Sequence, residues 1–371
     1  MFKYAGIIFG GMLLLLTGCT NVYQGSEAEP VPMEWTATNM VAPPRSPLKN
    51  YPAPAGVKTI PAPPVRPIPA PLKTAPPAPI LTWTSLDRWA AENKLAAPRK
   101  VANSPVVSYA INSRRGTMIL EIGSREATWN GLEMHLGFAP EIIDDQIFVY
   151  GLDLKKNLEP LLLDAPLVFG TNRVLVLDPG HGGANVGTHS VLDGRLEKEF
   201  TLDWARRLKP LLETNGWEVF LTRTGDTAMT NANRVVFAEA HHADVFISLH
   251  FNSAAPDTRP AGLETYCFTP TGMPSTVTRG YADPWPEKLS SNDFDDQNLK
   301  LALKLQGALL RATGMEDRGV RHVRYIEVLR GQKRPAVLIE GGYLSNPKEA
   351  EKIENPEYRE RLAEAVATAL R

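Results

Sequence analysis

The second half of the chain contains three short apolar runs that predict buried β-strands. They cover residues 174–177, 245–249 and 335–339 and are rich in β-branched and aliphatic side chains. Strands that alternate with helices favour an α/β domain. We therefore predict an α/β fold over residues 171–371, with a mostly parallel or mixed sheet flanked by helices. The apolar residues that recur at helical spacing after the first run are Leu202, Ala205, Leu208 and Leu212.

Residues 81–170 show a different pattern, with shorter apolar runs. Helical spacing covers residues 83–94, with Ser85 as N-cap, and residues 154–163. This combination predicts a small α+β domain ahead of the larger one. The strand-like runs are residues 106–111, 117–122, 126–129 and 147–150, and the turn residues are Gly123, Asn130-Gly131 and Asp144-Asp145.

The first 80 residues differ from both predicted domains. Residues 1–19 combine a basic start with an apolar core that is too short for a comfortable membrane span, which is typical of a signal peptide. The Leu-Thr-Gly-Cys sequence that ends at Cys19 resembles the bacterial lipobox. That resemblance implies lipid on Cys19 and, under the usual sorting rule, a lipoprotein of the outer membrane that faces the periplasm. The alternative is an ordinary signal peptide with an incidental cysteine.

Residues 20–80 are predicted to form a disordered linker. Sixteen of the 32 prolines in the chain lie between Pro30 and Pro79, and such a segment cannot build a core.

Each of the three predicted strands leads to a side chain with useful chemistry. The first leads through a glycine-rich turn to His181, the second ends at His250 and the third at Glu340. Because open α/β sheets bind ligands at the carboxyl ends of their strands, we expect these side chains to lie at one edge. Glu197, at the start of the predicted helix, is a fourth candidate, although an acid there could simply complement the helix dipole.

Two histidines and one glutamate, with a fourth position left to water, form an established ligand set for catalytic zinc. Glu340 would then be a further acid at the same edge. An ionised carboxylate at the end of a buried strand is costly unless it is paired or takes part in function. A structural ion pair is the alternative for Glu340, and the neighbouring histidines favour a catalytic role.

Residues 173–371 resemble the zinc-dependent N-acetylmuramoyl-L-alanine amidases of the amidase 3 family. The resemblance implies that His181, Glu197 and His250 bind one zinc ion and that Glu340 is the catalytic acid/base. The family often has aspartate two residues after the glutamate ligand, where this chain has Glu199, so Glu199 stays open as an alternative ligand. The shared motifs, in family order, are LDPGHGG, LEK, LTR, ADVFISLHFNS, GLETY, RGV, VLR and PAVLIEGGYLSN.

The same resemblance implies the reaction. The expected activity is hydrolysis of the amide bond between the lactyl group of N-acetylmuramic acid and L-alanine of the peptidoglycan stem peptide, by zinc-activated water. Two alternatives stay open: a zinc peptidase that acts on stem peptides, and a non-catalytic envelope lipoprotein that binds peptidoglycan. Dependence on a protein activator is also open. Residues 81–170 contain IGSREATWNG and LGFAPEIIDDQIFVYGLDL. With these stretches they resemble a small α+β module found beside cell-wall enzymes, which is related to the N-terminal domain of copper amine oxidases.

Three further residues are candidates for substrate binding. Asn252 could orient the substrate or support the preceding histidine. Arg223 could bind a stem-peptide carboxylate or pair with Asp226, and the structural role is preferred. Trp285 lies in a long irregular stretch, residues 269–293, where it could stack on a sugar. In some cell-division amidases of the family an insert here forms a helix that plugs the zinc site, and four prolines argue against such a helix in this chain.

Composition narrows the partners. A formal net charge of −1 with 22% charged residues gives no basic footprint for nucleic acid, and no P-loop or dinucleotide motif occurs. If Cys19 carries lipid, the other cysteine, Cys267, is left alone, so no intramolecular disulfide is expected. We expect a monomer whose partners are peptidoglycan and, through its lipid, a membrane.

Overall fold

The computed structural model describes residues 82–103, 105–170 and 172–371. The predicted signal peptide, Cys19 and the proline-rich linker lie outside these residues. Within the described ranges, no helix is both long and apolar enough to cross a membrane. These residues build one sheet of eleven strands and a second sheet of three strands.

Six strands of the large sheet come from the predicted α/β domain. Their order is β10-β9-β11-β14-β12-β13. The first four are parallel, whereas β12 runs antiparallel to β14 and parallel to β13. The predicted mixed sheet is confirmed, and the three predicted strands correspond to β9, β11 and β14. The strands are β9 (Val174–Pro179), β10 (Glu218–Leu221), β11 (Val245–Asn252), β12 (Leu263–Phe268), β13 (Asp317–Val323) and β14 (Ala336–Tyr343).

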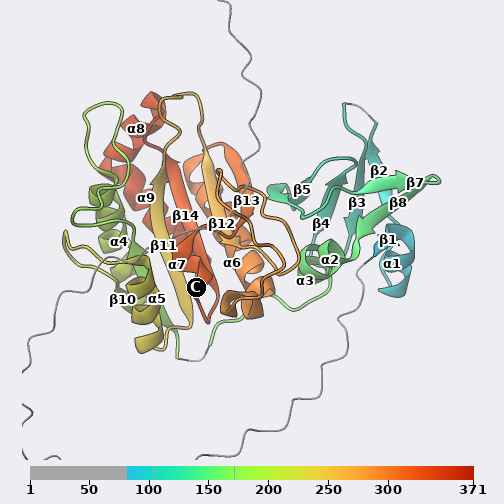
Figure 1. The fold of residues 1–371 in the computed structure, drawn as a ribbon, viewed down its shortest axis with the longest axis horizontal. Helices are drawn as coiled ribbons and strands as arrows, with labels where there is room; N and C mark the ends of the chain where they lie inside the picture. The colour runs from blue at the N-terminus through green and yellow to red at the C-terminus, as the bar shows by residue number, and fades with distance from the viewer. Residues whose placement is uncertain (1–81, 104, 171) are drawn as a thin grey trace, which may run out of the picture. The chain divides into compact units, whose positions relative to one another are not determined.

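Helices flank these strands (Figure 1). Leu175 of β9 packs in the core that contains Trp204 of α4, whereas its neighbour Val176 packs in the core that contains Ala238 of α5. Burial of both faces explains why the strands are continuous apolar runs. The helices are α4 (Glu197–Thr214), α5 (Asn231–Ala240), the 3-10 helix η2 (Ser290–Phe294), α6 (Asp295–Thr313), α7 (Glu327–Arg330), α8 (Pro347–Glu354) and α9 (Pro356–Ala369).

Local chemistry explains where α5 begins and ends. The hydroxyl of Thr230 caps the helix by accepting from the N–H of Asn233 at 3.2 Å. The helix ends at Ala240, and His242 has a left-handed backbone with φ of 50° that cannot continue it.

Residues 83–162 contain the expected mixture of short strands and helical turns. The predicted turns at Asn130-Gly131 and Asp144-Asp145 are confirmed, since all four residues have positive φ and connect neighbouring antiparallel strands. The strands are β1 (Trp83–Ser85), β2 (Arg99–Ala102), β3 (Ser108–Asn112), β4 (Thr117–Glu121), β5 (Glu126–Trp129), β6 (Leu132–His135), β7 (Glu141–Ile143) and β8 (Gln146–Tyr150). The helical turns are α1 (Leu86–Glu92), α2 (Gly151–Asp153), the π-helix η1 (Leu154–Leu158) and α3 (Glu159–Leu162).

The predicted helix over residues 83–94 is wrong at its start. Residues 83–85 form β1, which pairs with β8, and α1 begins only at Leu86. Ser85 is nevertheless the N-cap, and its hydroxyl accepts from the N–H of Arg88 at 3.5 Å. The sequence does not predict strands β2, β6 and β7, because each is only three or four residues long.

β6 joins the strands of residues 99–135 to those of the predicted α/β domain. It pairs in parallel with β13 through Met134 and Val320, and β5, β4, β3 and β2 continue the sheet outward. Arg125 also reaches across, donating to the carbonyls of Pro274 and Ser275 at 3.2 and 3.3 Å. One sheet therefore runs through both predicted domains, and the boundary at residue 170 stays a prediction.

Candidate metal centre

The turn after β9 brings His181 close to His250. His181 itself has a left-handed backbone with φ of 63°, and the two imidazole rings lie 4.8 Å apart between centroids. The close approach needs Gly180, because a Cβ on that residue would lie 2.3 Å from the His250 ring. The glycine-rich motif thus serves a steric purpose: it clears the space in which the two histidines meet.

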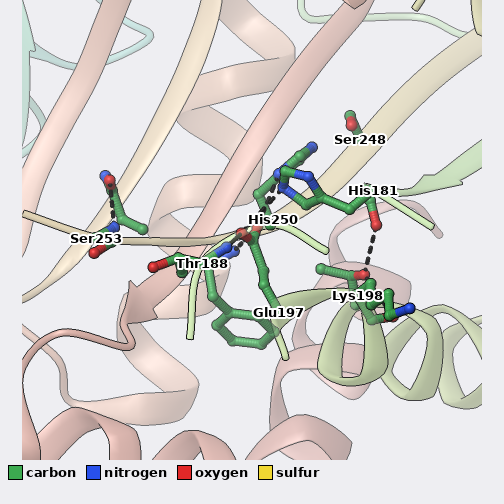
Figure 2. A network of polar contacts seen from close by, with 12 residues as sticks. His181, Thr188, Glu197, Lys198, Ser248, His250 and Ser253 are labelled. Atoms are coloured by element: carbon green, nitrogen blue, oxygen red, sulfur yellow. Dashed lines mark hydrogen bonds and ion pairs between the residues drawn. The ribbon is translucent and has the colours of Figure 1, made fainter. Parts of the chain in front are cut away.

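Glu197, in the first turn of α4, lies between the two histidines (Figure 2). One carboxylate oxygen is 3.0 Å from Nε2 of His181, and the other is 2.9 Å from Nδ1 of His250. Main-chain N–H groups of Thr188 and Phe251 also donate to it, at 2.9 and 3.1 Å. Burial would raise the pKa of Glu197, but the hydrogen bonds from the histidines outweigh burial and hold the pKa well below its usual range.

These three residues fit a metal ion. One ligand atom from each of His181, Glu197 and His250 lies within 4.8 Å of the others, and two imidazoles with one carboxylate suit zinc. The backbone also packs closely against this group, since a Cβ on Gly187 would lie 2.5 Å from a carboxylate oxygen of Glu197. The neighbouring acid Glu199 is exposed and faces Arg195 at 3.6 Å, so the structure brings Glu197 and not Glu199 to the histidines.

Glu340 lies beside this group on β14. It stands opposite His250 in the parallel register of β11 and β14, and only 8% of its surface is exposed. One of its carboxylate oxygens, Oε2, is buried and has no hydrogen-bond partner among the described residues. Burial raises the pKa of Glu340 well above its ordinary value, and the Glu197 carboxylate adds to the rise. A structural ion pair therefore does not account for this residue.

A cavity of about 280 Å³ opens onto the group. His181, Glu197, His250 and Glu340 all line it, so the four sequence-predicted residues share one space. The cavity is also lined by an arginine, Arg279, which the sequence did not single out. Arg279 lies in the irregular segment between β12 and η2, where no spacing rule could have marked it.

The three residues predicted to bind substrate have different surroundings. Asn252 also lines this cavity, but it is buried and its amide donates to Glu264 at 2.6 Å. Trp285 is half exposed and is not among the residues that line the cavity. Arg223 is only 3% exposed and lies beneath the His181 turn.

Arg223 contacts main-chain carbonyls, and the ion pair with Asp226 that the sequence favoured does not form. Its guanidinium donates to the carbonyls of Pro179 and Gly180 at 2.9 and 2.8 Å and to that of Lys198 at 2.7 Å. Its expected partner Asp226 bonds elsewhere, to the ammonium group of Lys198 at 2.7 Å. Arg223 thus ties the His181 turn to α4.

Asp178, which the sequence did not mark as a candidate, links the elements beneath the site. It is fully buried and pairs with Arg234 of α5. Its carboxylate also accepts from the hydroxyls of Thr222 and Ser248 at 2.6 and 2.7 Å. The signal was present as the aspartate of the LDPGHGG motif, where a charged residue directly follows the apolar run of β9.

The irregular segment between β12 and η2 forms no helix or strand from residue 269 to residue 289. It is nonetheless anchored: Met273 is fully buried, and the N–H of Ser275 donates to Asp283 at 2.7 Å. The segment therefore lies beside the cavity as an ordered loop that contributes Arg279 to it.

An α/β domain with a two-histidine, one-glutamate cluster at the carboxyl ends of its central strands defines a class of candidate zinc hydrolases. Residues 175–371 match the family model described as N-acetylmuramoyl-L-alanine amidase, and the chain belongs to this family. The chain is 32% identical over 200 residues to the probable cell wall amidase LytH of Staphylococcus aureus. The match covers 54% of this chain and 57% of the relative, so the chain spans little more than half the length of the curated relatives it matches.

Solved structures similar to this chain carry related names. An N-acetylmuramoyl-L-alanine amidase from Clostridium difficile 630 is 30% identical, with a TM-score of 0.45, and the match covers 54% of this chain and 96% of that one. The amidase AmiC2 of Nostoc punctiforme is 29% identical, with a TM-score of 0.45 and the same coverage.

Proposed function

We propose that this protein is a zinc-dependent N-acetylmuramoyl-L-alanine amidase. The observation that carries the proposal is the convergence of His181, Glu197 and His250 beside a buried Glu340 in a chain of the amidase family. Its substrate would be peptidoglycan, and the bond cleaved would join the lactyl carbonyl of N-acetylmuramic acid to L-alanine of the stem peptide.

In this proposal, His181, Glu197 and His250 hold one zinc ion. The bound ion supplies Lewis acidity, which polarises the carbonyl of a neutral amide. Glu340 removes a proton from the attacking water as the hydroxyl adds to the carbonyl carbon, and it passes that proton to the alanine nitrogen as the C–N bond breaks. The raised pKa that burial gives Glu340 suits the second half of this role, in which the carboxyl group holds the proton and donates it.

The N-terminal residues bear on where in the cell this activity takes place. We propose that residues 1–19 are a lipoprotein signal peptide, that Cys19 carries lipid at the outer membrane, and that residues 20–80 let the enzyme reach the cell wall from there. The lipobox-like sequence and the sixteen prolines support this. Residues 81–170 form a small accessory domain, and the protein acts as a monomer. Incorporation of labelled palmitate, and its loss in Cys19→Ser, tests the anchor.

The reaction is tested by incubating the zinc-loaded protein with purified peptidoglycan and analysing the products by mass spectrometry. We expect stem peptides with a free N-terminal L-alanine and glycan strands without peptide, and neither product with Glu340→Ala. Cleavage inside the stem peptide would show a peptidase instead. A folded, zinc-loaded protein that releases nothing would contradict the proposal and favour a peptidoglycan-binding lipoprotein.

A further inference from the structure

A second cavity, of about 360 Å³, adjoins the one at the candidate metal centre. The two cavities have four lining residues in common: Asn252, Ser253, Tyr266 and Arg279. A substrate that occupies the first cavity can therefore extend directly into the second. None of the residues predicted to bind zinc or to catalyse the reaction lines this second cavity.

Positive charge dominates the second cavity. Three arginines line it, Arg279, Arg318 and Arg321, against a single acid, Glu264. We call this space the arginine cavity. A surplus of guanidinium groups around one carboxylate favours a ligand that brings further negative charge.

Glu264 lies at ion-pair distance from Arg318 and Arg321 but makes no short hydrogen bond with either. It is 3% exposed, and its Oε1 already accepts from the amide of Asn252 at 2.6 Å and the hydroxyl of Tyr343 at 2.7 Å. The Nε atoms of Arg318 and Arg321 stay 3.5 and 3.8 Å from its oxygens, which is too far for a well-formed hydrogen bond. The Nε of Arg318 is buried and has no hydrogen-bond partner among the described residues.

Arg279 stands where the two cavities meet. Its guanidinium donates to Oδ1 of Asn252 at 3.2 Å and to the hydroxyl of Tyr266 at 2.8 Å. Both acceptors are uncharged, so the positive charge of Arg279 has no carboxylate at hydrogen-bond distance among the described residues. A ligand carboxylate in the arginine cavity would share that space with all three guanidinium groups.

A third cavity, of about 390 Å³, opens onto His181 and His250 and is lined by Tyr281, Tyr325 and Asn231 but by none of these three arginines. The proposed substrate has the matching asymmetry. On one side of the cleaved amide lies a sugar whose lactyl carboxyl is tied up in the bond, and on the other lies a peptide with free carboxylates.

We propose that the arginine cavity is the subsite for a stem-peptide carboxylate, on the alanine side of the amide. This inference rests on the proposed amidase function and assigns the direction in which the substrate lies. Arg318 and Arg321 bind the carboxylate within the cavity, and Arg279 orients the peptide as it leaves the metal centre. The enzyme therefore distinguishes acidic stem peptides from amidated ones.

Binding and hydrolysis test the subsite separately. Calorimetry compares L-alanyl-D-glutamate with its diamide, using the full chain loaded with zinc. We expect the acid to bind at least roughly tenfold more tightly, since hydrogen bonds to a charged group contribute about 1.5–3 kcal/mol. The ratio of the affinity for the acid to that for the diamide should fall towards one in Arg318→Gln and Arg321→Gln. It should fall in Arg279→Gln as well. Thermal unfolding checks that each variant is folded. Arg279→Gln is the substitution least able to disturb the fold, because Arg279 lies on an exposed part of the loop.

Arg311→Gln is the matched control, because Arg311 is exposed on α6 and lines neither the arginine cavity nor the two cavities at the metal centre. Its acid-to-amide ratio should equal that of the unaltered protein. A preference for the acid that survives in the folded arginine variants would place the carboxylate on the metal and overturn the subsite, as would equal or undetectable binding of both peptides.

The hydrolysis assay on peptidoglycan separates the two proposals. Preferential binding of the acid without any cleavage would contradict the proposed amidase function but would support the arginine cavity as a carboxylate site. Cleavage with no difference in kcat/KM between muramoyl peptides that carry the acid and the amide would remove the subsite and leave the amidase.

Discussion

Gly187 lies against two of the three candidate zinc ligands. Its backbone has φ of 74°, and an added Cβ would lie 2.5 Å from the Glu197 carboxylate and 2.8 Å from the His181 ring. We expect Gly187→Ala to lower zinc affinity at least roughly tenfold, because the ligands would have to move from their shared centre. Competition with a chromogenic chelator measures the change.

Gly194→Ala is the control for that substitution. Gly194 has nearly the same φ, 77°, but an added Cβ would meet no atom within 4 Å. Both variants carry the same backbone strain, so only the contact with the ligands differs. Equal zinc affinity in the two variants would contradict a steric role for Gly187.

Glu340 and Glu199 are both acids near the predicted ligands, but the structure separates their roles. We expect Glu340→Gln to lower kcat on peptidoglycan by roughly 100- to 10,000-fold while one zinc ion per chain stays bound. Glu199→Gln should keep both activity and zinc, because Glu199 is exposed and faces Arg195. Activity assays paired with metal analysis decide this. Loss of zinc in Glu199→Gln would restore the alternative ligand assignment.

At the scale of elements, Asp178 joins four segments: β9, the residue after β10, β11 and α5. Its buried charge faces Arg234, and Arg234 also donates to the carbonyl of His181 at 2.7 Å. The position of the His181 turn therefore depends on an ion pair between the end of β9 and α5.

We expect Asp178→Asn to lower the free energy of unfolding by about 3–5 kcal/mol, because Arg234 would be left as an uncompensated buried charge. Urea denaturation measures it. Asp257→Asn, which removes the acid of an exposed pair with Arg259, should change stability little. Similar midpoints for the two variants would show that the Asp178 pair does not hold these elements together.

At the scale of the whole molecule, a buried polar cluster joins residues of the predicted small domain to β12 and β13. Nε2 of His322 on β13 lies 3.3 Å from Oδ1 of Asn157, and its Nδ1 lies 3.3 Å from Sγ of Cys267. Burial lowers the pKa of His322 to about 3, and His135 and Arg125 nearby add to the shift. Burial likewise lowers the pKa of His135 on β6 to about 4.

This cluster predicts a loss of stability in acid. Between about pH 6.5 and 4 the unfolded chain binds protons at both histidines while the folded chain does not, so each histidine lowers the free energy of unfolding by up to about 1.4 kcal/mol per pH unit. Asp153 opposes this between about pH 6 and 4, because burial raises its folded pKa to about 6. Two histidines outweigh one aspartate, so the cluster as a whole is destabilising as pH falls.

Replacing His322 isolates its part of the effect. We expect His322→Gln to reduce the slope of stability against pH between about pH 6 and 4, as measured by urea denaturation at a series of pH values. His189→Gln, at an exposed position, should leave the slope unchanged. Superimposable slopes for His322→Gln and the unaltered protein would contradict a buried neutral imidazole.

The sequence by itself determined the strands that carry the site and the identity of its central residues. The apolar runs at the starts of β9, β11 and β14 are short and rich in β-branched and aliphatic residues, which favours strands buried on both faces. His181 follows β9, whereas His250 and Glu340 lie within β11 and β14, just after the apolar runs. Family motifs then assigned roles to those positions. Local turn chemistry was equally legible, as at Asn130-Gly131, because a positive φ at such residues depends only on near neighbours.

Tertiary structure decided what depends on contacts between distant residues. Glu197 and Glu199 look alike in the chain, and only packing shows that Glu197 lies between the histidines while Glu199 faces solvent. Arg279 has no local signal, because its role comes from a loop folding back against Asn252 and Tyr266. The parallel pairing of β6 with β13 joins residues nearly two hundred positions apart. No periodicity in the sequence reports such pairings, because the free energy that selects them comes from burial in the assembled sheet.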